Sequence, residues 1–223
     1  MRLPGLGGWR EDPLWAGFYD WSVEHPTLGG MLWRLGIDSD LGRLYDATAE
    51  IGRQPEGSSI LDIPCGGGVA LRGLRPHQGV RYVAADIAPT MLARTRDAAA
   101  ERGVADQLET VQADVTALRF ADGEFDLVVS FTGLHCFPDP RAAVHEMARV
   151  VAHGGVLSGS ALVHRPGLAG ARDLPLWTAG RLAGLLGPGT TADQIAGWLA
   201  EAGLSEVEVG LSGAIGYFHA VRR

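Results

Sequence analysis

The chain has 223 residues, of which 46% are hydrophobic and 20% are charged, and its formal net charge is −7. This composition is ordinary for a folded soluble protein with one substantial α/β domain and a modest extension. The acidic charge argues against nucleic acid as a partner, and no apolar run reaches the ~18 residues that a membrane span needs. The first residues lack a signal-peptide core, and Cys65 and Cys136 are too few for a disulfide framework. We therefore expect a cytoplasmic protein.

Residues 1–57 carry no strand pattern and are rich in aromatic side chains. Asp12 and Pro13 predict the start of a first helix, and a second helix is expected over 41–51. We interpret this part of the chain as a helical arm that packs on the main domain. The arm could also close as a cap over a bound ligand, with Tyr19 as the first candidate for contact.

The stretch from Ser59 to Gly68 is the part around which the rest is organised. Apolar residues lead to Asp62, and three glycines follow before an apolar segment that runs to Leu74. The pattern predicts a buried parallel strand, a tight turn and the start of an α-helix. The glycines let the backbone approach a ligand, and the helix start would bind an anionic group.

From residue 58 onward, predicted strands and helices alternate as one domain, 58–223. Further strands are expected over 80–86, 108–114, 125–131 and 156–163, and helices over 89–102 and 140–152. The segment 164–189 breaks this rhythm, either as a packed connection or as a lid, with a short helix around 176–186.

A helix over 191–202, with Thr191 as its candidate cap, and two strands, over 205–209 and 215–221, close the chain. The order predicts a doubly wound, mostly parallel seven-stranded sheet of the Rossmann-like type. Its C-terminal strand is expected to be antiparallel, and the N-terminal arm to form a helical cap.

Acidic residues end the first three predicted strands, at Asp62, Asp86 and Asp114. A single such residue can be a helix cap or a turn residue. Ligands of doubly wound sheets bind beyond the carboxyl ends of the strands, so three carboxylates on that rim indicate a binding site.

The glycine spacing separates two ligand classes. A dinucleotide site needs a third glycine, and Leu71 stands in its place. The pattern Leu61-Asp62-x-x-Cys65-Gly66-x-Gly68 instead resembles the first motif of class I S-adenosylmethionine-dependent methyltransferases. Pro64 stands where that family usually has glycine, which stiffens the loop and removes one N–H donor.

A second motif narrows the resemblance. The segment His135-Cys136-Phe137-Pro138-Asp139-Pro140 is similar to one found in ubiquinone/menaquinone-biosynthesis-type C-methyltransferases, with Cys136 in place of a second histidine. The resemblance implies S-adenosylmethionine as cofactor and a small-molecule methyl acceptor. It leaves the acceptor and the methylated atom open.

The resemblance also implies a role for each position of the cofactor site. Asp62, Cys65, Gly66 and Gly68 would surround the methionine part, Asp86 the ribose, Ile87 and Met91 the adenine, Asp114 and Val115 its amino edge, and Ser130 and Phe131 the sulfonium. His135 is the candidate base, because an unperturbed pKa of about 6.5 suits proton transfer at neutral pH, although it could equally hold the loop or line the pocket. Tyr19 is a second candidate, and no metal site is expected.

We therefore expect a methyltransferase that acts on carbon or oxygen of a small hydrophobic or aromatic molecule. One alternative is a protein of the same fold that binds the cofactor without transferring methyl, as a cyclase-type enzyme or a non-catalytic partner. A nicotinamide oxidoreductase is disfavoured by Leu71 and by the closing strands. A homodimer is left open.

Overall fold

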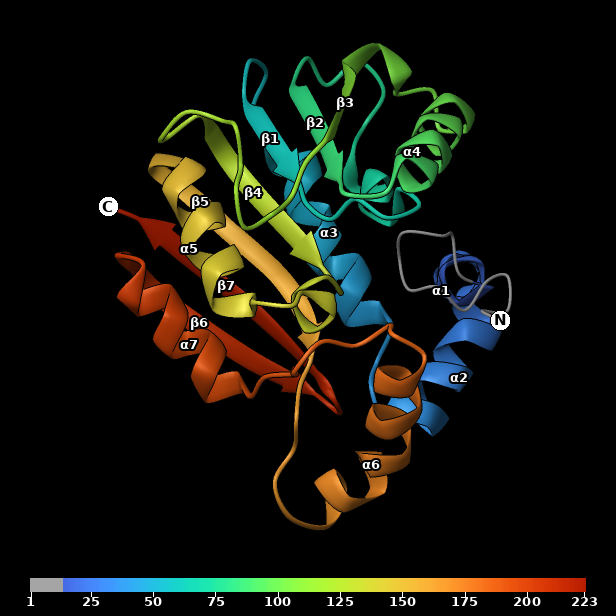
Figure 1. Cartoon of the computed structure of the whole chain (residues 1–223). Helices are drawn as coiled ribbons and strands as arrows, with labels where there is room; N and C mark the ends of the chain where they lie inside the picture. The colour runs from blue at the N-terminus through green and yellow to red at the C-terminus, as the bar shows by residue number, and fades with distance from the viewer. Residues whose placement is uncertain (1–13) are drawn as a thin grey trace.

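The computed structural model describes residues 14–223, with side chains from residue 17, and contains a mixed seven-stranded sheet (Figure 1). The strands are β1 (Ser59–Asp62), β2 (Arg81–Asp86), β3 (Leu108–Gln112), β4 (Phe125–Phe131), β5 (Val151–Leu162), β6 (Leu204–Ser212) and β7 (Ile215–Arg222). Their order is β3-β2-β1-β4-β5-β7-β6, and β7 runs antiparallel to both of its neighbours. This confirms the predicted fold class.

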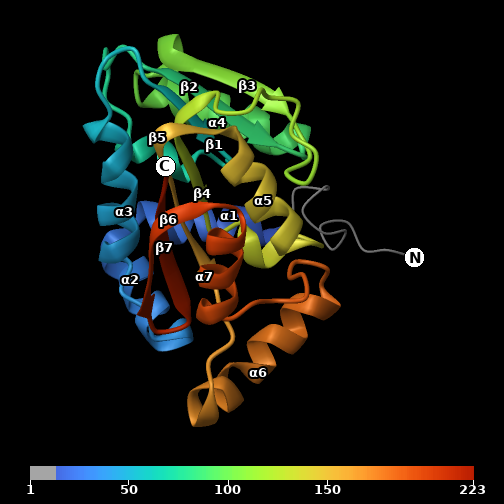
Figure 2. The same cartoon turned by 90° about the vertical axis from the view of Figure 1, so that its left-hand side faces the viewer.

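Helices cover both faces of the sheet (Figure 2). They are α1 (Leu14–Glu24), α2 (Pro26–Ile37), α3 (Gly42–Arg53), α4 (Pro89–Glu101), α5 (Pro140–Val150), α6 (Gly167–Leu182) and α7 (Ala192–Glu201). The apolar side chains of α3 and α4 pack in one core layer, and those of α5 and α7 pack in the other. Within the described residues, no helix has the length and apolarity that a membrane crossing requires.

The predicted elements agree with the structure where the sequence pattern is strong. The almost continuous apolar run of β4 predicts a central strand, and Leu127, Val128 and Val129 are indeed fully buried between β1 and β5. The predicted cap of α7 is also present, because Thr191 and Gln194 form a reciprocal capping box. The predicted start of α1 at Asp12 and Pro13 lies outside the described residues.

Helix α2, which packs closely on α1, was not expected from the sequence. A Cβ added at Gly29 would lie 1.7 Å from the carbonyl oxygen of Ser22, so only glycine permits this approach. The Trp33 indole N–H donates to the Ser22 hydroxyl at 3.2 Å. Gly29, a residue type that weakens a helix pattern, is therefore the residue that lets the two helices touch.

The α-helix predicted after the glycine loop is replaced by a short 3-10 turn, Val69–Gly73. The reason is that α3 packs against this segment: a Cβ at Gly73 would lie 1.9 Å from the carbonyl oxygen of Thr48. A 3-10 segment of five residues aligns only a few peptide dipoles, far fewer than an α-helix of ordinary length. The expected anion site at a helix amino terminus is therefore absent from this loop.

Helix α6 begins nine residues before the helix predicted around 176–186 and is tied to the arm. Arg165 forms a bidentate pair with the buried Asp173, at 2.7 and 2.8 Å, and contacts Asp38 just after α2 at 3.2 Å. Arg172 donates to the carbonyl oxygen of Leu35 at 3.0 Å. These contacts fasten α6 to α2 near the carboxyl end of β5, where Figure 1 shows it.

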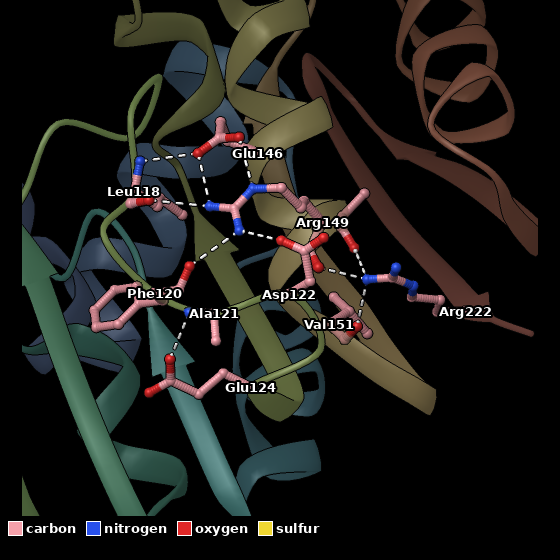
Figure 3. A network of polar contacts seen from close by, with 10 residues as sticks. Leu118, Phe120, Ala121, Asp122, Glu124, Glu146, Arg149, Val151 and Arg222 are labelled. Carbon is pink, nitrogen blue, oxygen red and sulfur yellow. Dashed lines mark hydrogen bonds and ion pairs between the residues drawn. The ribbon is translucent and has the colours of Figure 1, made fainter.

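At the amino ends of β4 and β5, a charged network fastens α5 to the loop before β4 (Figure 3). The Arg149 guanidinium donates to both carboxylate oxygens of Glu146, at 2.9 and 3.0 Å, and to Asp122 at 2.6 Å. It also donates to the carbonyl oxygens of Leu118 and Phe120, each at 3.0 Å. The network lies at the edge of the sheet opposite the strand tips, so we interpret it as structural.

We predict that Arg149→Met lowers the free energy of unfolding by about 1–3 kcal/mol, because buried carbonyl oxygens and Glu146 lose a charged donor. As a matched control, Arg141→Met removes a more exposed pair with Glu201. That change should cost about 0–1 kcal/mol. Urea unfolding of both variants measures the difference, and equal losses would contradict the structural role of the network.

Candidate active site

The glycine loop begins where β1 ends. Gly66 and Gly68 have φ angles of +52° and +87°, which favour glycine. No atom of the described residues would lie within 4 Å of a Cβ added at Gly66, so this part of the chain leaves the backbone there uncovered. Pro64 packs against Gly133, where an added Cβ would lie 2.2 Å from the proline Cδ. The proline is thus accommodated by a glycine at the tip of β4.

Asp62 lies beneath this loop and is almost fully buried. It accepts a hydrogen bond from the Tyr82 hydroxyl at 2.8 Å. Burial, and to a lesser extent the nearby charge of Asp86, raises the pKa of Asp62 from 3.8 to about 7, while the Tyr82 hydrogen bond opposes the rise. The residue supports the loop from below more than it lines the surface above it.

Asp86 ends β2 and connects the loop to the rest of the rim. Its two carboxylate oxygens accept from the backbone N–H groups of Gly66, at 3.0 Å, and Ala88, at 2.9 Å. Burial raises the pKa of Asp86, and these N–H donors oppose the rise. The carboxylate is therefore fixed at the strand tip, beside the exposed side chain of Ile87.

The residues expected around the adenine occupy the neighbouring rim. Met91 is 2% exposed and packs against Ala88 below the surface, whereas Ile87 is 36% exposed. Gln112 donates to the carbonyl oxygen of Ile87 at 3.0 Å and so joins the tips of β2 and β3. Val115 is buried in the core.

Asp114 follows β3 by two residues instead of ending it, because the ladder with β2 ends at Gln112. Its side chain is exposed and accepts from the backbone and the hydroxyl of Thr116, at 2.9 and 2.7 Å. These hydrogen bonds form an Asx-type turn, which fixes the Asp114 carboxylate on the same rim.

The tip of β4 carries a buried hydroxyl and a strained residue. Ser130 is fully buried, and its Oγ is one of the enclosed side-chain atoms of the described residues without a hydrogen-bond partner. Phe131 is 6% exposed. Thr132 has a φ of +52°, unusual for a β-branched residue. Its hydroxyl is hydrogen-bonded to the Tyr19 phenol at 2.8 Å, which attaches α1 to the strand tip.

The two predicted bases lie near this tip, and their surroundings differ. Burial raises the pKa of the Tyr19 phenol well above 10.0, so Tyr19 stays protonated at neutral pH. His135 lies in a short 3-10 turn, Leu134–Cys136, and its Nδ1 accepts the backbone N–H of Leu162 at 3.0 Å. Burial lowers the pKa of His135 to about 4, so its imidazole is neutral.

Several residues that the sequence analysis missed shape the site. The Thr95 hydroxyl on α4 donates to the carbonyl oxygen of Gly66 at 2.8 Å and also contacts the Cys65 sulfur at 3.3 Å. Cys65 is therefore buried under the loop, so any contact with a ligand would use its backbone. A hydroxyl in mid-helix is the only signal that could have indicated Thr95.

Asp20 on α1 is a second missed residue. A Cβ at Gly67 would lie 2.1 Å from a carboxylate oxygen of Asp20, so glycine is needed for this side chain to reach the loop. Arg94 lies 3.7 Å from the same carboxylate. Together with neighbouring groups, Asp20 and Gly67 line a hollow of about 320 Å³ between α1 and α4. The aromatic arm gave no pattern that would indicate this contact.

The raised pKa of Asp62 predicts a pH effect on stability. In the unfolded chain this carboxyl ionises near its ordinary pKa of 3.8, and in the folded protein near 7. Between these values the folded state holds the extra proton, so the contribution of Asp62 to stability falls as pH rises from about 4 to about 7.

Asp62→Asn keeps an oxygen that accepts from Tyr82 but cannot ionise. The stability of this variant relative to wild type should therefore rise across that window and stay constant above it. Denaturant unfolding from pH 4 to pH 8 measures the difference, with Asp126→Asn at the amino end of the sheet as control. Parallel pH profiles for Asp62→Asn and wild type would contradict the raised pKa.

The sequence is similar to known methyltransferases. The family model described as "Methyltransferase domain" matches residues 61–158. The uncharacterized protein Rv1405c of Mycobacterium tuberculosis is 33% identical over 199 residues, which cover 76% of this chain and 69% of that protein. The ubiquinone/menaquinone biosynthesis C-methyltransferase UbiE of Xylella fastidiosa is 37% identical over 126 residues, covering 56% of this chain. The match spans 49% of the UbiE chain.

Solved structures share the fold at lower sequence identity. A protein from Bordetella parapertussis, described as a possible exported protein, has a TM-score of 0.75 at 20% identity, covering 93% of this chain and 79% of that one. The (4+2)-cyclase SpnF has a TM-score of 0.66 at 21% identity, covering 82% of each chain. These likenesses concern the fold alone. The sequence relatives go further, because they show that the chain belongs to the class I S-adenosylmethionine-dependent methyltransferases of the ubiquinone-biosynthesis type.

Proposed function

We propose that this methyltransferase modifies carbon or oxygen of a small, apolar or aromatic acceptor. The observation that carries the proposal is the aromatic packing beyond the tip of β4. Just beyond that tip, Thr132 is hydrogen-bonded to Tyr19, whose ring lies 6.2 Å from the ring of Trp33 of α2. Trp33, Phe131 of β4 and Trp177 of α6 belong to one extended apolar cluster, and Tyr19 and Tyr217 pack against it. Side chains of this kind favour a planar or hydrophobic ligand and disfavour a highly charged one.

The strand tips fit S-adenosylmethionine as the cofactor. The backbone over Gly66 is open, and the carboxylate of Asp86 is fixed beside it. The Ser130 hydroxyl is buried without a partner at the neighbouring tip, where a bound ligand could satisfy it. Carboxylates and bare backbone suit a ligand that carries hydroxyl groups, an ammonium and a positively charged sulfur.

Within that site, the roles inferred from the motifs remain our proposal. Asp86 would accept from the ribose hydroxyls, since a carboxylate has lone pairs left beyond the two bonds to backbone N–H groups. Ile87 would cover the adenine on its exposed side, with Met91 beneath, and Asp114 and Val115 would meet its amino edge. Asp20, held above Gly67, adds a carboxylate near the methionine end.

Catalysis then depends mainly on positioning. When bound, the cofactor supplies a methyl group on a positively charged sulfur. The residues of the chain hold the acceptor in line with that group and exclude water, and a well-oriented pair of reactants can gain ~7–11 kcal/mol. Phe131 and Ser130 lie at the strand tip nearest to the expected methyl position.

Residues 1–57 and 164–189 are proposed to be the cap and the lid over the acceptor. The Tyr19–Thr132 hydrogen bond joins the arm to the β4 tip, and the Arg165–Asp173 pair holds α6 in place. Acceptor release would require these contacts to loosen. The net charge of −7 supports our expectation that nucleic acid is not a partner, and the presence of only two cysteines in the sequence supports a reducing, cytoplasmic setting.

A product assay tests the proposed function. The full chain is incubated with S-adenosylmethionine and a panel of phenols, quinols and enolisable ketones, and S-adenosylhomocysteine is measured by mass spectrometry. We expect its formation to depend on an apolar, aromatic acceptor. A product formed while the cofactor stays intact would instead favour a cyclase-type enzyme. Methyl transfer only to highly charged acceptors would contradict the proposed acceptor class.

We predict that Asp86→Ala weakens binding of S-adenosylhomocysteine by about 10- to 100-fold, because charge-assisted hydrogen bonds are worth ~1.5–3 kcal/mol. Calorimetric titration measures the affinity. Asp126→Ala is the control, since the Asp126 carboxylate on β4 accepts from the backbone N–H of Ser59 at the amino end of β1, at the opposite edge of the sheet from the strand tips. Unchanged affinity in Asp86→Ala would contradict the ribose role.

A further inference from the structure

The imidazole of His135 is held where β4 and β5 end together. Phe131 of β4 pairs with Ser160 of β5, and Leu162 ends β5 two residues later. The Leu162 N–H donates to Nδ1 of His135, and the carbonyl oxygen of His135 accepts from Gly187 at 2.8 Å. The ring therefore has a fixed position on the rim.

Nδ1 of this ring is hydrogen-bonded to the backbone, and Nε2 on the opposite edge is open. Among the described residues, Nε2 of His135 has no hydrogen-bond partner. It also differs from the fully enclosed atoms without a partner, such as Ser130 Oγ, because it is not completely covered by protein. Leu162, against which the ring is held, belongs to the same apolar cluster as Phe131 and Trp177. The His135 ring therefore lies at the ends of β4 and β5, where Phe131 and Leu162 bring this apolar cluster to the rim.

The hydrogen bond at Nδ1 determines the tautomer. A neutral imidazole carries one proton, and the nitrogen that accepts a hydrogen bond is the one without it. The backbone N–H of Leu162 can only donate, so Nδ1 is the acceptor and the proton is on Nε2. Burial, which holds the ring neutral, leaves this tautomer in place across physiological pH.

A general base would need the opposite arrangement. It must present an unprotonated nitrogen to the group that loses its proton. His135 presents an N–H there, and Tyr19 is a protonated phenol at neutral pH. Neither of the two residues expected to act as a base is arranged to remove a proton.

We propose that His135 binds the methyl acceptor by donating a hydrogen bond from Nε2–H to an acceptor oxygen. This inference rests on the proposed function and narrows the acceptor to molecules with a carbonyl, enolate or phenolate oxygen at or beside the methylated atom. A carbonyl compound therefore reacts as its enolate, which like a phenolate has lost its proton to solvent before it binds and needs no base in the site. Bond formation to the methyl group and departure of the electron pair to sulfur leave both products neutral at the reacting atoms.

The tautomer is tested by NMR of the full chain labelled with nitrogen-15, without cofactor. Long-range proton–nitrogen spectra separate the two tautomers and the imidazolium, and His135→Asn identifies the signals. We expect a neutral ring with the proton on Nε2 from pH 5.5 to pH 8. A proton on Nδ1, or a charged ring at pH 7, would overturn the proposal without involving methyl transfer.

Two probes that differ in one oxygen test the contact. At pH 8, 4-nitrophenolate should shift the Nε2–H signal and bind about 10- to 100-fold more tightly than nitrobenzene, as a charged hydrogen bond implies. The difference should disappear in His135→Asn, whose side-chain oxygen can still accept from Leu162. Equal binding of the two probes, no binding of either, or a difference that persists in the variant would contradict the contact.

Turnover separates a donor from a base and from a purely structural residue. His135→Gln can place an amide N–H near the position of Nε2, whereas His135→Asn cannot. For a donor, His135→Asn should lower kcat/KM about 10- to 100-fold and His135→Gln should restore part of it. A base would be indicated if both variants lost kcat/KM equally and if the wild-type rate rose with pH as a group of pKa 6–7 loses its proton. Full activity in His135→Asn would indicate a structural role, and either result would overturn the proposal.

Discussion

The backbone N–H of Gly66 donates to the carboxylate of Asp86, and this bond fixes the glycine loop against the tip of β2. The bond needs a positive φ at residue 66, which glycine allows, and a buried carboxylate at the end of a neighbouring strand, which the parallel ladder between β1 and β2 places there. Asp62 and Tyr82 support the loop from beneath, and Thr95 holds its carbonyl oxygen from the side. The open backbone above the loop is therefore rigid before any ligand arrives.

Around this fixed point, segments far apart in the sequence meet at the tips of β4 and β5. Helix α1 reaches the β4 tip through Tyr19 and Thr132, and α6 is fastened to α2 through Arg165 and Arg172. The charged network of Arg149 holds the opposite edge of the sheet. The edge of the sheet at the amino ends of β4 and β5 thus carries a stabilising charged network. The edge at the strand tips carries carboxylates, open backbone and aromatic side chains.

The sequence predicted the parts of the fold that depend on local pattern. Three local features each specify their element independently of distant residues. They are the apolar run of β4, the Thr191 cap of α7 and Gly103 just after α4. The helix after the glycine loop was wrongly predicted because α3 occupies the space at Gly73, a contact no local pattern shows. Helix α2 was missed because Gly29, which weakens a helix pattern, is there to let two helices touch.

In the site too, the features that follow from local sequence were predicted, and those that depend on distant contacts were not. Asp62 and Asp86 lie at the strand tips as the pattern indicated, since strand ends are local features. Asp114 starts a turn after β3 instead of ending the strand. Asp20 gave no signal, and Thr95 gave only a hydroxyl in mid-helix, because their positions depend on how the arm and α4 pack. The state of His135 depends on a single backbone N–H 27 residues away in the chain, which only the structure could place.

The account rests on the claim that the strand tips at Gly66, Asp86 and Asp114 hold the cofactor. A crystal structure of the full chain with S-adenosylhomocysteine tests this most directly. The account predicts the ribose hydroxyls at the Asp86 carboxylate, the amino acid end over Gly66, and the sulfur facing the tip of β4. Density for the nucleoside elsewhere on the molecule, with the Gly66–Asp86 loop uncovered, would contradict it.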